Sequence, residues 1–272
     1  MSTVVPLEEA HDHGVFGSKA VGLGEAARGG LPLPPGFALD GEIVEAVAAG
    51  EEGAIREVVD TVGELRGPLA VRSSAVDEDG AEASFAGQHL TLLNVPSNEE
   101  LPAAVKEIWW SANSDSAITY RQRVGLFARP SVGVVVQTLL DPEVAGVMFT
   151  RNPIDGADER VIEASWGLGE AVVAGLVIPD HFRVARSGEV IERKPGLKSI
   201  AVRKRPEGGT YEEQLSRELA EQSCLDDAQL ADLNGLATLC EEVYGPDRDI
   251  EWAIADGQLY LLQCRAITRA GG

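Results

Sequence analysis

Hydrophobic positions in the first half of the chain follow helical spacing, with short apolar runs between the helical segments. The pattern predicts helices at residues 20–28, at 42–65 with a break near Gly50, and at 99–127. The apolar runs predict strands at 68–72 and 90–95, and the small residues at 80–88 indicate a loop. We therefore expect a helix-rich first lobe.

After Pro130 the pattern changes to short apolar runs that are typical of β-strands. Strands are predicted at residues 132–137, 144–150, 160–164, 181–185, 189–193 and 197–202. Helices are predicted at 212–222 and 226–243, and a hairpin at 248–265. This mixture predicts an α+β fold of two lobes, residues 1–130 and residues 131–272.

Composition makes the expected surface strongly acidic. The 272 residues include 44 acidic and 23 basic side chains, a formal net charge of −21. Such a surface repels phosphate backbones and anionic headgroups, so we expect neither nucleic-acid nor membrane binding. The chain has no apolar run long enough to span a membrane, and its first residues do not resemble a signal peptide, so we expect a cytoplasmic protein. Its three cysteines lack metal-ligand spacing and fit reduced thiols.

The last residues carry a hairpin signal, the dipeptide Asp256-Gly257 between two apolar runs. A two-residue loop at this dipeptide mixes charged and apolar side chains on both faces. A three-residue loop at 255–257, with Gly257 left-handed, separates them and is preferred. One face then carries the apolar set Ile250, Trp252, Ile254, Tyr260, Leu262 and Cys264. The other carries Asp249, Glu251, Gln263 and Arg265, beside Ala253, Leu259 and Leu261.

The polar face of this hairpin has the chemistry of a metal and phosphate site. Asp249, Glu251 and Gln263 offer carboxylate and amide oxygens, which are ligands that Mg²⁺ accepts. The Arg265 guanidinium is a fork that suits phosphate. A solvated hairpin face with a surface ion pair explains the same residues, and the spacing alone does not choose between the two interpretations.

Two cations stand at element ends where an anionic ligand could bind. Lys19 follows Gly17-Ser18 at the start of a helix, where backbone N–H groups and a lysine can hold phosphate. Arg72 ends an apolar strand, where an arginine usually has an anionic partner. The alternatives are a solvated lysine and a structural ion pair. Glu163, before two glycines, could approach a ribose hydroxyl or simply precede a turn.

Five segments together resemble a known family, and they occur in family order over nearly the whole chain. They are Gly17–Glu25 with Gly30–Phe37, Val71–Ala75 with Glu82–Gln88, Ala145–Thr150 with Asn152-Pro153, Ile162–Glu170, and Asp249–Trp252 with Leu262–Arg265. The chain resembles the ATP-grasp-like nucleotide-binding domain of phosphoenolpyruvate synthase, pyruvate phosphate dikinase and rifampin phosphotransferase. The resemblance implies a two-lobed ATP-grasp-like fold with ATP in the cleft between lobes.

The resemblance also implies roles for individual residues, with ATP and Mg²⁺ as cofactors. Lys19, Arg72 and Arg265 are expected to contact ATP phosphates and to act in catalysis. Asp249, Glu251 and Gln263 are expected to hold Mg²⁺ or orient the triphosphate. Further nucleotide contacts are expected from Gly87, Gln137 and Glu163, the last two near the adenosine.

Proteins of this family pass phosphate through a histidine on a separate domain. No histidine here stands in the Gly-rich Thr-Ser-His context of that domain, and His181 is interpreted as structural. The first hypothesis is therefore an ATP-binding component that phosphorylates a histidine on a partner subunit, and thence a small acceptor such as pyruvate or a hydroxyl compound. A self-sufficient small-molecule kinase and a non-catalytic nucleotide-sensing subunit are the alternatives. The polar set at the hairpin argues against the sensor, which has no need of it.

Overall fold

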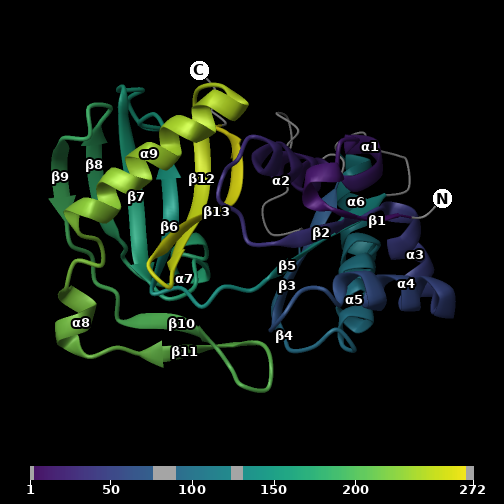
Figure 1. Cartoon of the computed structure of the whole chain (residues 1–272). Coiled ribbons are helices and arrows are strands. Elements are labelled where there is room, and N and C mark those ends of the chain that lie inside the picture. The colour runs from purple at the N-terminus through teal and green to yellow at the C-terminus, as the bar shows by residue number, and fades with distance from the viewer. Residues whose placement is uncertain (1–2, 76–89, 124–130, 268–272) are drawn as a thin grey trace. The chain divides into compact units, whose positions relative to one another are not determined.

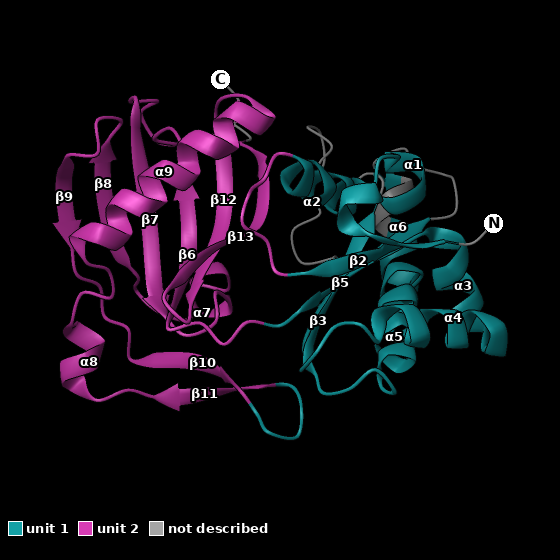
Figure 2. Ribbon diagram, in the orientation of Figure 1, with its two compact units in different colours: residues 1–28, 35–139, 205–209 teal, residues 29–34, 140–204, 210–272 magenta. Residues whose placement is uncertain are grey.

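The computed structural model describes residues 3–75, 90–123 and 131–267. It contains the helices and strands of an α+β protein and divides into two compact units (Figure 2). The first unit comprises residues 1–28, 35–139 and 205–209, and the second comprises 29–34, 140–204 and 210–272. The predicted fold class, with two separate units of mixed helix and sheet, is confirmed.

The first unit is built on a five-stranded antiparallel sheet with the strand order β1-β2-β5-β3-β4. Its strands are β1 (Val4–Pro6), β2 (Gly36–Leu39), β3 (Leu69–Ala75), β4 (Thr91–Val95) and β5 (Val132–Thr138). One face packs with α3 (Gly41–Ala49), α4 (Glu52–Val62) and α5 (Leu101–Ala112) into an apolar core. The run of valines in β5 is buried because both faces of this central strand are covered.

The other face of this sheet is approached by α2 (Ser18–Arg28), which follows the short η1 (Leu7–Glu9) and α1 (His13–Phe16). Asp12 caps α1, and its side chain accepts a hydrogen bond from the Gly14 backbone N–H. Gly17, between α1 and α2, has a φ of 80°, and a Cβ there would lie 2.0 Å from the Ser74 carbonyl oxygen. Only glycine therefore lets the start of α2 approach β3 so closely.

The second unit is built on a six-stranded antiparallel sheet with the order β13-β12-β6-β7-β8-β9 (Figure 1). Its strands are β6 (Val144–Phe149), β7 (Glu159–Trp166), β8 (Asp180–Ala185), β9 (Val190–Lys194), β12 (Arg248–Ala255) and β13 (Gln258–Ala266). The long helix α9 (Asp227–Tyr244) lies along one face and buries its apolar stripe there (Figure 1). A capping box at Asp226 and Gln229 fixes where α9 begins.

Smaller elements complete the second unit. Helix α7 (Glu170–Val173) packs against β6, β7 and β10, and α8 (Arg217–Glu221) precedes α9. Strands β10 (Ile200–Lys204) and β11 (Thr210–Gln214) form a separate two-stranded ribbon. A fully buried ion pair joins Lys198 to Asp180, whose other oxygen accepts from the Cys224 backbone N–H at 2.7 Å.

Three expectations about elements differ from the structure. The helix predicted at 99–127 is broken, with α5 ending at Ala112 and α6 (Asp115–Arg123) beginning after Ser114. Polar side chains cause the break: Asn113 Nδ2 donates to the Trp109 carbonyl, and Ser114 Oγ accepts from the Ala117 N–H. The helix predicted at 212–222 is instead β11 followed by α8.

The third difference concerns the boundary between the units. The prediction placed it near residue 130, whereas the chain passes from the first unit to the second after Leu139. The strand in between, β5, hydrogen-bonds with β2 and β3 and therefore belongs to the first sheet. Within the described ranges, none of the helices combines the length and the hydropathy that crossing a bilayer requires.

Candidate metal and phosphate site

The β12–β13 hairpin turns through two residues, not three. Asp256 and Gly257 have φ values of 51° and 70°, and Ala255 pairs directly with Gln258. Two positive φ angles are the geometry that Asp-Gly supports in a tight hairpin. The predicted three-residue loop is therefore wrong, and Tyr260 does not join the apolar face, because it pairs with Ala253.

A β-bulge nevertheless brings the predicted polar set together. The pairing passes from Trp252–Leu261 to Glu251–Gln263, so Leu262 is the extra residue on β13. Beyond this bulge Asp249 pairs with Arg265, and the four polar side chains share one face of the sheet. Leu261 takes the place expected of Leu262 and is fully buried opposite Trp252.

Three of the four side chains of this polar set are joined by ion pairs. Arg265 Nε lies 2.9 Å from Asp249 Oδ2, and Arg265 Nη2 lies 3.7 Å from Glu251 Oε1. The Asp249 and Glu251 side chains are 17% and 19% exposed, and Arg265 is 44% exposed. One guanidinium thus pairs with two carboxylates at a half-open surface and offsets the charge of only one of them. An arginine fork of this kind also suits an anionic ligand.

Asp249 stands out within this group because one of its oxygens is buried without a partner. Oδ2 accepts from Arg265, whereas Oδ1 is shielded from solvent and has no hydrogen bond to any residue that the structure describes. Burial raises the pKa of Asp249 above its ordinary value, and the nearby Arg265 offsets only part of that rise. A buried carboxylate oxygen of this kind costs free energy unless a cation or donor reaches it.

The donor set fits Mg²⁺. Two carboxylates and the largely buried Gln263 side chain offer oxygen ligands to a hard cation, and a bound cation would satisfy the unpartnered Asp249 oxygen. Among the residues that the structure describes, no group of three or more His, Cys, Asp or Glu could hold a metal. An ion here would therefore need other oxygens, which matches the habit of Mg²⁺ to bind through one or two carboxylates plus substrate phosphates.

The same face of the sheet extends sideways to Glu163. Gln263, Glu251, Val147, Glu163 and His181 pair in succession across five neighbouring strands. Glu163 therefore lies two strands from Glu251, roughly 10 Å away at the usual strand spacing. His181 Nδ1 lies 3.9 Å from Glu163 Oε1, which agrees with a structural role for this histidine. The contact of Glu163 with adenosine stays a prediction.

In the first unit, Lys19 is buried and not solvated. Its Nζ donates to the Ser73 carbonyl at 3.0 Å, and its side chain is 7% exposed. The Ala20 backbone N–H donates to Ser74 Oγ at 3.0 Å, so the first turn of α2 is fixed to the end of β3. A lysine held this rigidly has lost the freedom that a surface lysine keeps. Its contact with phosphate stays a prediction.

Arg72 and Gln137 share a face of the first sheet. Arg72 pairs with Val135, and Gln137 pairs with Ala70, so the two side chains lie on neighbouring strands, one row apart on the α2 side. Arg72 is half-buried and Gln137 is buried. Gly87, expected near the phosphates, lies outside the described residues, and so does the loop at 80–88.

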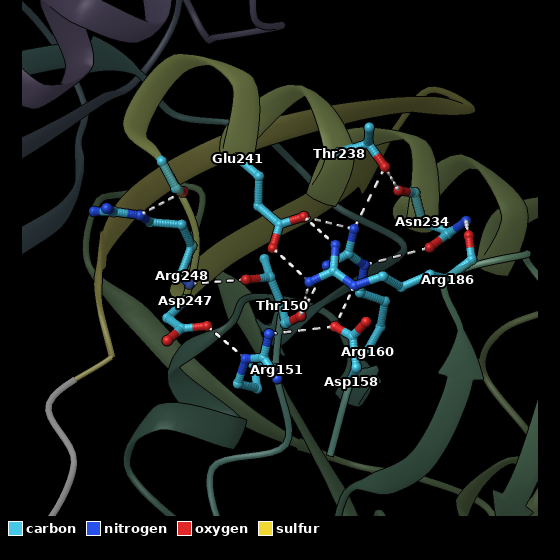
Figure 3. Close-up of polar contacts among 11 residues, drawn as sticks. Thr150, Arg151, Asp158, Arg160, Arg186, Asn234, Thr238, Glu241, Asp247 and Arg248 are labelled. Carbon is cyan, nitrogen blue, oxygen red and sulfur yellow. Dashed lines mark hydrogen bonds and ion pairs between the residues drawn. The ribbon is translucent and has the colours of Figure 1, made fainter. Parts of the chain in front are cut away.

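The sequence interpretation missed a polar cluster on the opposite face of the second sheet (Figure 3). It centres on Arg160, at the start of β7, and on Glu241 of α9, which form an ion pair with an N–O distance of 2.8 Å. The available signal was an arginine at the end of an apolar strand: Arg160 precedes its apolar run, whereas Arg72, which was singled out, follows one.

The family relationship agrees with this site. The family model described as "Pyruvate phosphate dikinase, AMP/ATP-binding domain" matches residues 39–272. This match covers most of the chain. It includes the β12–β13 hairpin, whose polar side chains share one face of the sheet. The chain belongs to this AMP/ATP-binding family of pyruvate phosphate dikinase, and the predicted family is confirmed.

Curated relatives of this chain carry the names of phosphotransferases and phosphoenolpyruvate synthases. A Bacillus subtilis protein called an uncharacterized phosphotransferase is 39% identical over 93% of this chain and 33% of its own length. A probable phosphoenolpyruvate synthase from Methanothermobacter thermautotrophicus is 34% identical over 96% of this chain and 45% of its own. A rifampicin phosphotransferase from a Streptomyces species is 34% identical over 97% of this chain and 36% of its own length. The chain thus spans between a third and a half of these relatives.

Proposed function

We propose that this chain binds Mg·ATP and transfers a phosphoryl or pyrophosphoryl group to a histidine on a partner polypeptide. A small acceptor, such as pyruvate or a hydroxyl compound, then receives the group. The observation that carries the proposal is the Asp249 carboxylate, buried with one oxygen unpaired beside Glu251 and Arg265. Such an arrangement destabilises an empty protein and suits one that binds a cation with its anionic ligand.

Asp249, Glu251 and Gln263 would hold Mg²⁺, which neutralises phosphate charge when bound. Arg265, whose side chain is 44% exposed, would bind and orient phosphate oxygens. Lys19 and Arg72 are proposed as further phosphate ligands, with Gln137 and Glu163 at the nucleoside. Transfer to histidine forms a P–N bond and breaks a P–O bond of ATP, and it needs positioning and charge neutralisation more than covalent help from the protein.

The partner is proposed from the relatives. Their names describe whole phosphotransferases and phosphoenolpyruvate synthases, of which the present 272 residues correspond only to the nucleotide-binding part. The histidine and the acceptor site are therefore expected outside these 272 residues, and we propose that they lie on a partner polypeptide. A neighbouring reading frame with a Gly-rich Thr-Ser-His segment is the candidate partner.

The test uses ATP labelled at the β- or γ-phosphate. The chain is incubated with each label and Mg²⁺, alone and with the candidate partner, and both proteins and small products are analysed. We expect label on a partner histidine, with none when Mg²⁺ is removed by chelation. Turnover of a small acceptor without the partner would instead establish a self-sufficient kinase, and nucleotide binding without any transfer would establish a sensor.

A further inference from the structure

A polar network lies between α9 and the second sheet, next to the start of β12 (Figure 3). Asp249 projects from the opposite face of this sheet, because side chains alternate along β12. At the centre of the network the Arg160 side chain is 1% exposed and pairs with Glu241. Arg186 joins Glu241 from the other side, with Nη1–Oε2 and Nη2–Oε1 distances of 2.7 and 3.0 Å. Burial alone would raise the pKa of Glu241, but the hydrogen bonds from Arg186 and Arg160 outweigh it and lower the pKa to about 2. The network is thus permanently charged at neutral pH.

Thr150 connects this network to β12. It follows β6 directly, is fully buried, and has every polar group engaged. Its carbonyl accepts from Arg160 Nη1 at 2.8 Å. Its backbone N–H donates to the Arg248 carbonyl at 2.8 Å, and its Oγ1 accepts from the Arg248 backbone N–H at 2.8 Å. Thr150 therefore holds both backbone groups of Arg248.

Arg248 is the residue immediately before Asp249. Phe149 pairs with Asp249, so Thr150 stands beside Arg248 and holds its backbone from the side of the neighbouring strand. Because side chains alternate along a strand, Asp249 projects from the face opposite to that of Arg248. The position of the Asp249 carboxylate is consequently set by how firmly the first residue of β12 is held. A metal ligand must stay within roughly 0.5 Å of its productive place, which requires a rigid support of this kind.

We propose that Thr150, which is held by the Arg160 that pairs with Glu241, is a positioning residue for the Asp249 carboxylate in metal binding. The inference rests on the proposed function, because it takes Asp249 as a metal ligand. Thr150 touches neither the metal nor the nucleotide. It acts through the Arg248 backbone, and its Oγ1 is the group that a sheet hydrogen bond cannot replace.

The matched variants are Thr150→Val and Thr150→Ser. Valine has the same shape as threonine but removes Oγ1, which leaves the Arg248 N–H without its acceptor. Serine keeps the hydroxyl. The measurement is the dissociation constant of Mn²⁺ in the presence of ATP, taken from the electron paramagnetic resonance signal of free Mn²⁺. We expect about tenfold weaker Mn²⁺ binding for Thr150→Val, as for other supporting partners of metal ligands, and recovery with Thr150→Ser.

Asp249→Asn is the reference that separates the two ideas. If Asp249→Asn binds Mn²⁺ as well as the wild type, the proposed metal site itself is wrong. If Asp249→Asn weakens Mn²⁺ binding and a folded Thr150→Val does not, only the positioning role is lost.

Should Thr150→Val not fold, Arg160→Lys takes its place. It keeps a buried positive charge beside Glu241 but lacks the fork that also reaches the Thr150 carbonyl. Weaker Mn²⁺ binding by this variant, with ATP affinity in the absence of metal unchanged, supports the role. Unchanged Mn²⁺ binding overturns it.

Discussion

The two faces of the six-stranded sheet treat buried carboxylates in opposite ways. On the α9 face, both oxygens of Glu241 accept from arginines, and its pKa is lowered to about 2. On the other face, Asp249 keeps one oxygen unpaired, and burial raises its pKa. The two carboxylates are nevertheless connected, because Arg160 binds Thr150 and Thr150 binds the backbone of Arg248, the residue before Asp249.

The contrast separates a structural carboxylate from a binding carboxylate. A satisfied network stabilises the fold and needs nothing more, because each buried charge already has its counter-charge. An unsatisfied oxygen is a cost in the empty protein that a bound cation removes. The same reasoning marks the fully buried Lys198–Asp180 pair as structural, since both Asp180 oxygens have partners.

The largest effect is expected where the satisfied network is broken. Glu241→Gln removes the counter-charge of Arg160, which is buried, and should lower the free energy of unfolding by about 3 kcal/mol. Urea unfolding of the metal-free chain measures this loss. The control is Glu242→Gln, at the exposed residue next to Glu241 on α9. This variant should change the free energy of unfolding by less than about 0.5 kcal/mol. Equal stability of the two variants would show that the network does not support the fold.

The next largest effect is expected on the face of the sheet that carries Asp249 and Glu251, and it concerns the activation free energy of ATP turnover. Glu251→Gln is isosteric and removes one charged metal ligand, so Mg²⁺-dependent ATP turnover should fall about 100-fold, equivalent to roughly 2.7 kcal/mol. The melting temperature without ligands should stay near that of the wild type, since Glu251 lies at a half-open surface. Unchanged turnover would remove Glu251 from the site.

Asp249→Asn tests the cost of the unpaired oxygen directly. Because the wild-type carboxylate is incompletely satisfied, the metal-free variant should be as stable as the wild type or slightly more stable. Stabilisation by Mg·ATP, about 1.4 kcal/mol at ten times the wild-type Kd, should disappear. Thermal unfolding with and without Mg·ATP gives both values. A clear loss of metal-free stability would mean that Asp249 is a structural residue like Glu241.

The last expected effect is a pair of opposite pH dependences in the metal-free protein. The folded pKa of Glu241, about 2, lies below its ordinary value of 4.5, so its contribution to stability is present above pH 4.5 and is lost as pH falls toward 2. The folded pKa of Asp249 is raised, so its ionisation reduces stability as pH rises above its ordinary value of 3.8. Urea unfolding across this range should show that Glu241→Gln removes part of the acid-induced loss. The free energy of unfolding of Asp249→Asn should increase relative to that of the wild type as pH rises. Parallel curves of stability against pH for all three proteins would contradict both assignments.

The hairpin shows how local and global rules combined in this chain. The Asp256-Gly257 pair alone indicates a two-residue turn, and the separation of polar from apolar side chains demands a shift of one residue. Both indications were sound, and the bulge at Leu262 satisfies both at once. A three-residue loop was the simpler way to obtain that shift, and the sequence offers no mark that places the extra residue at Leu262.

By itself the sequence determined the α+β class, most helices and strands, and the family, because periodicity, turn residues and short motifs are local properties. It also placed Asp249 and Glu251 on one face of a strand, since side chains alternate with a period of two. Only the tertiary structure decided that Gln263 and Arg265 join them, that Asp249 Oδ1 has no partner within the described part of the chain, and that Arg160 meets Glu241. Those facts depend on strand register and on how α9 packs against the sheet, which are set by contacts between residues far apart in the chain.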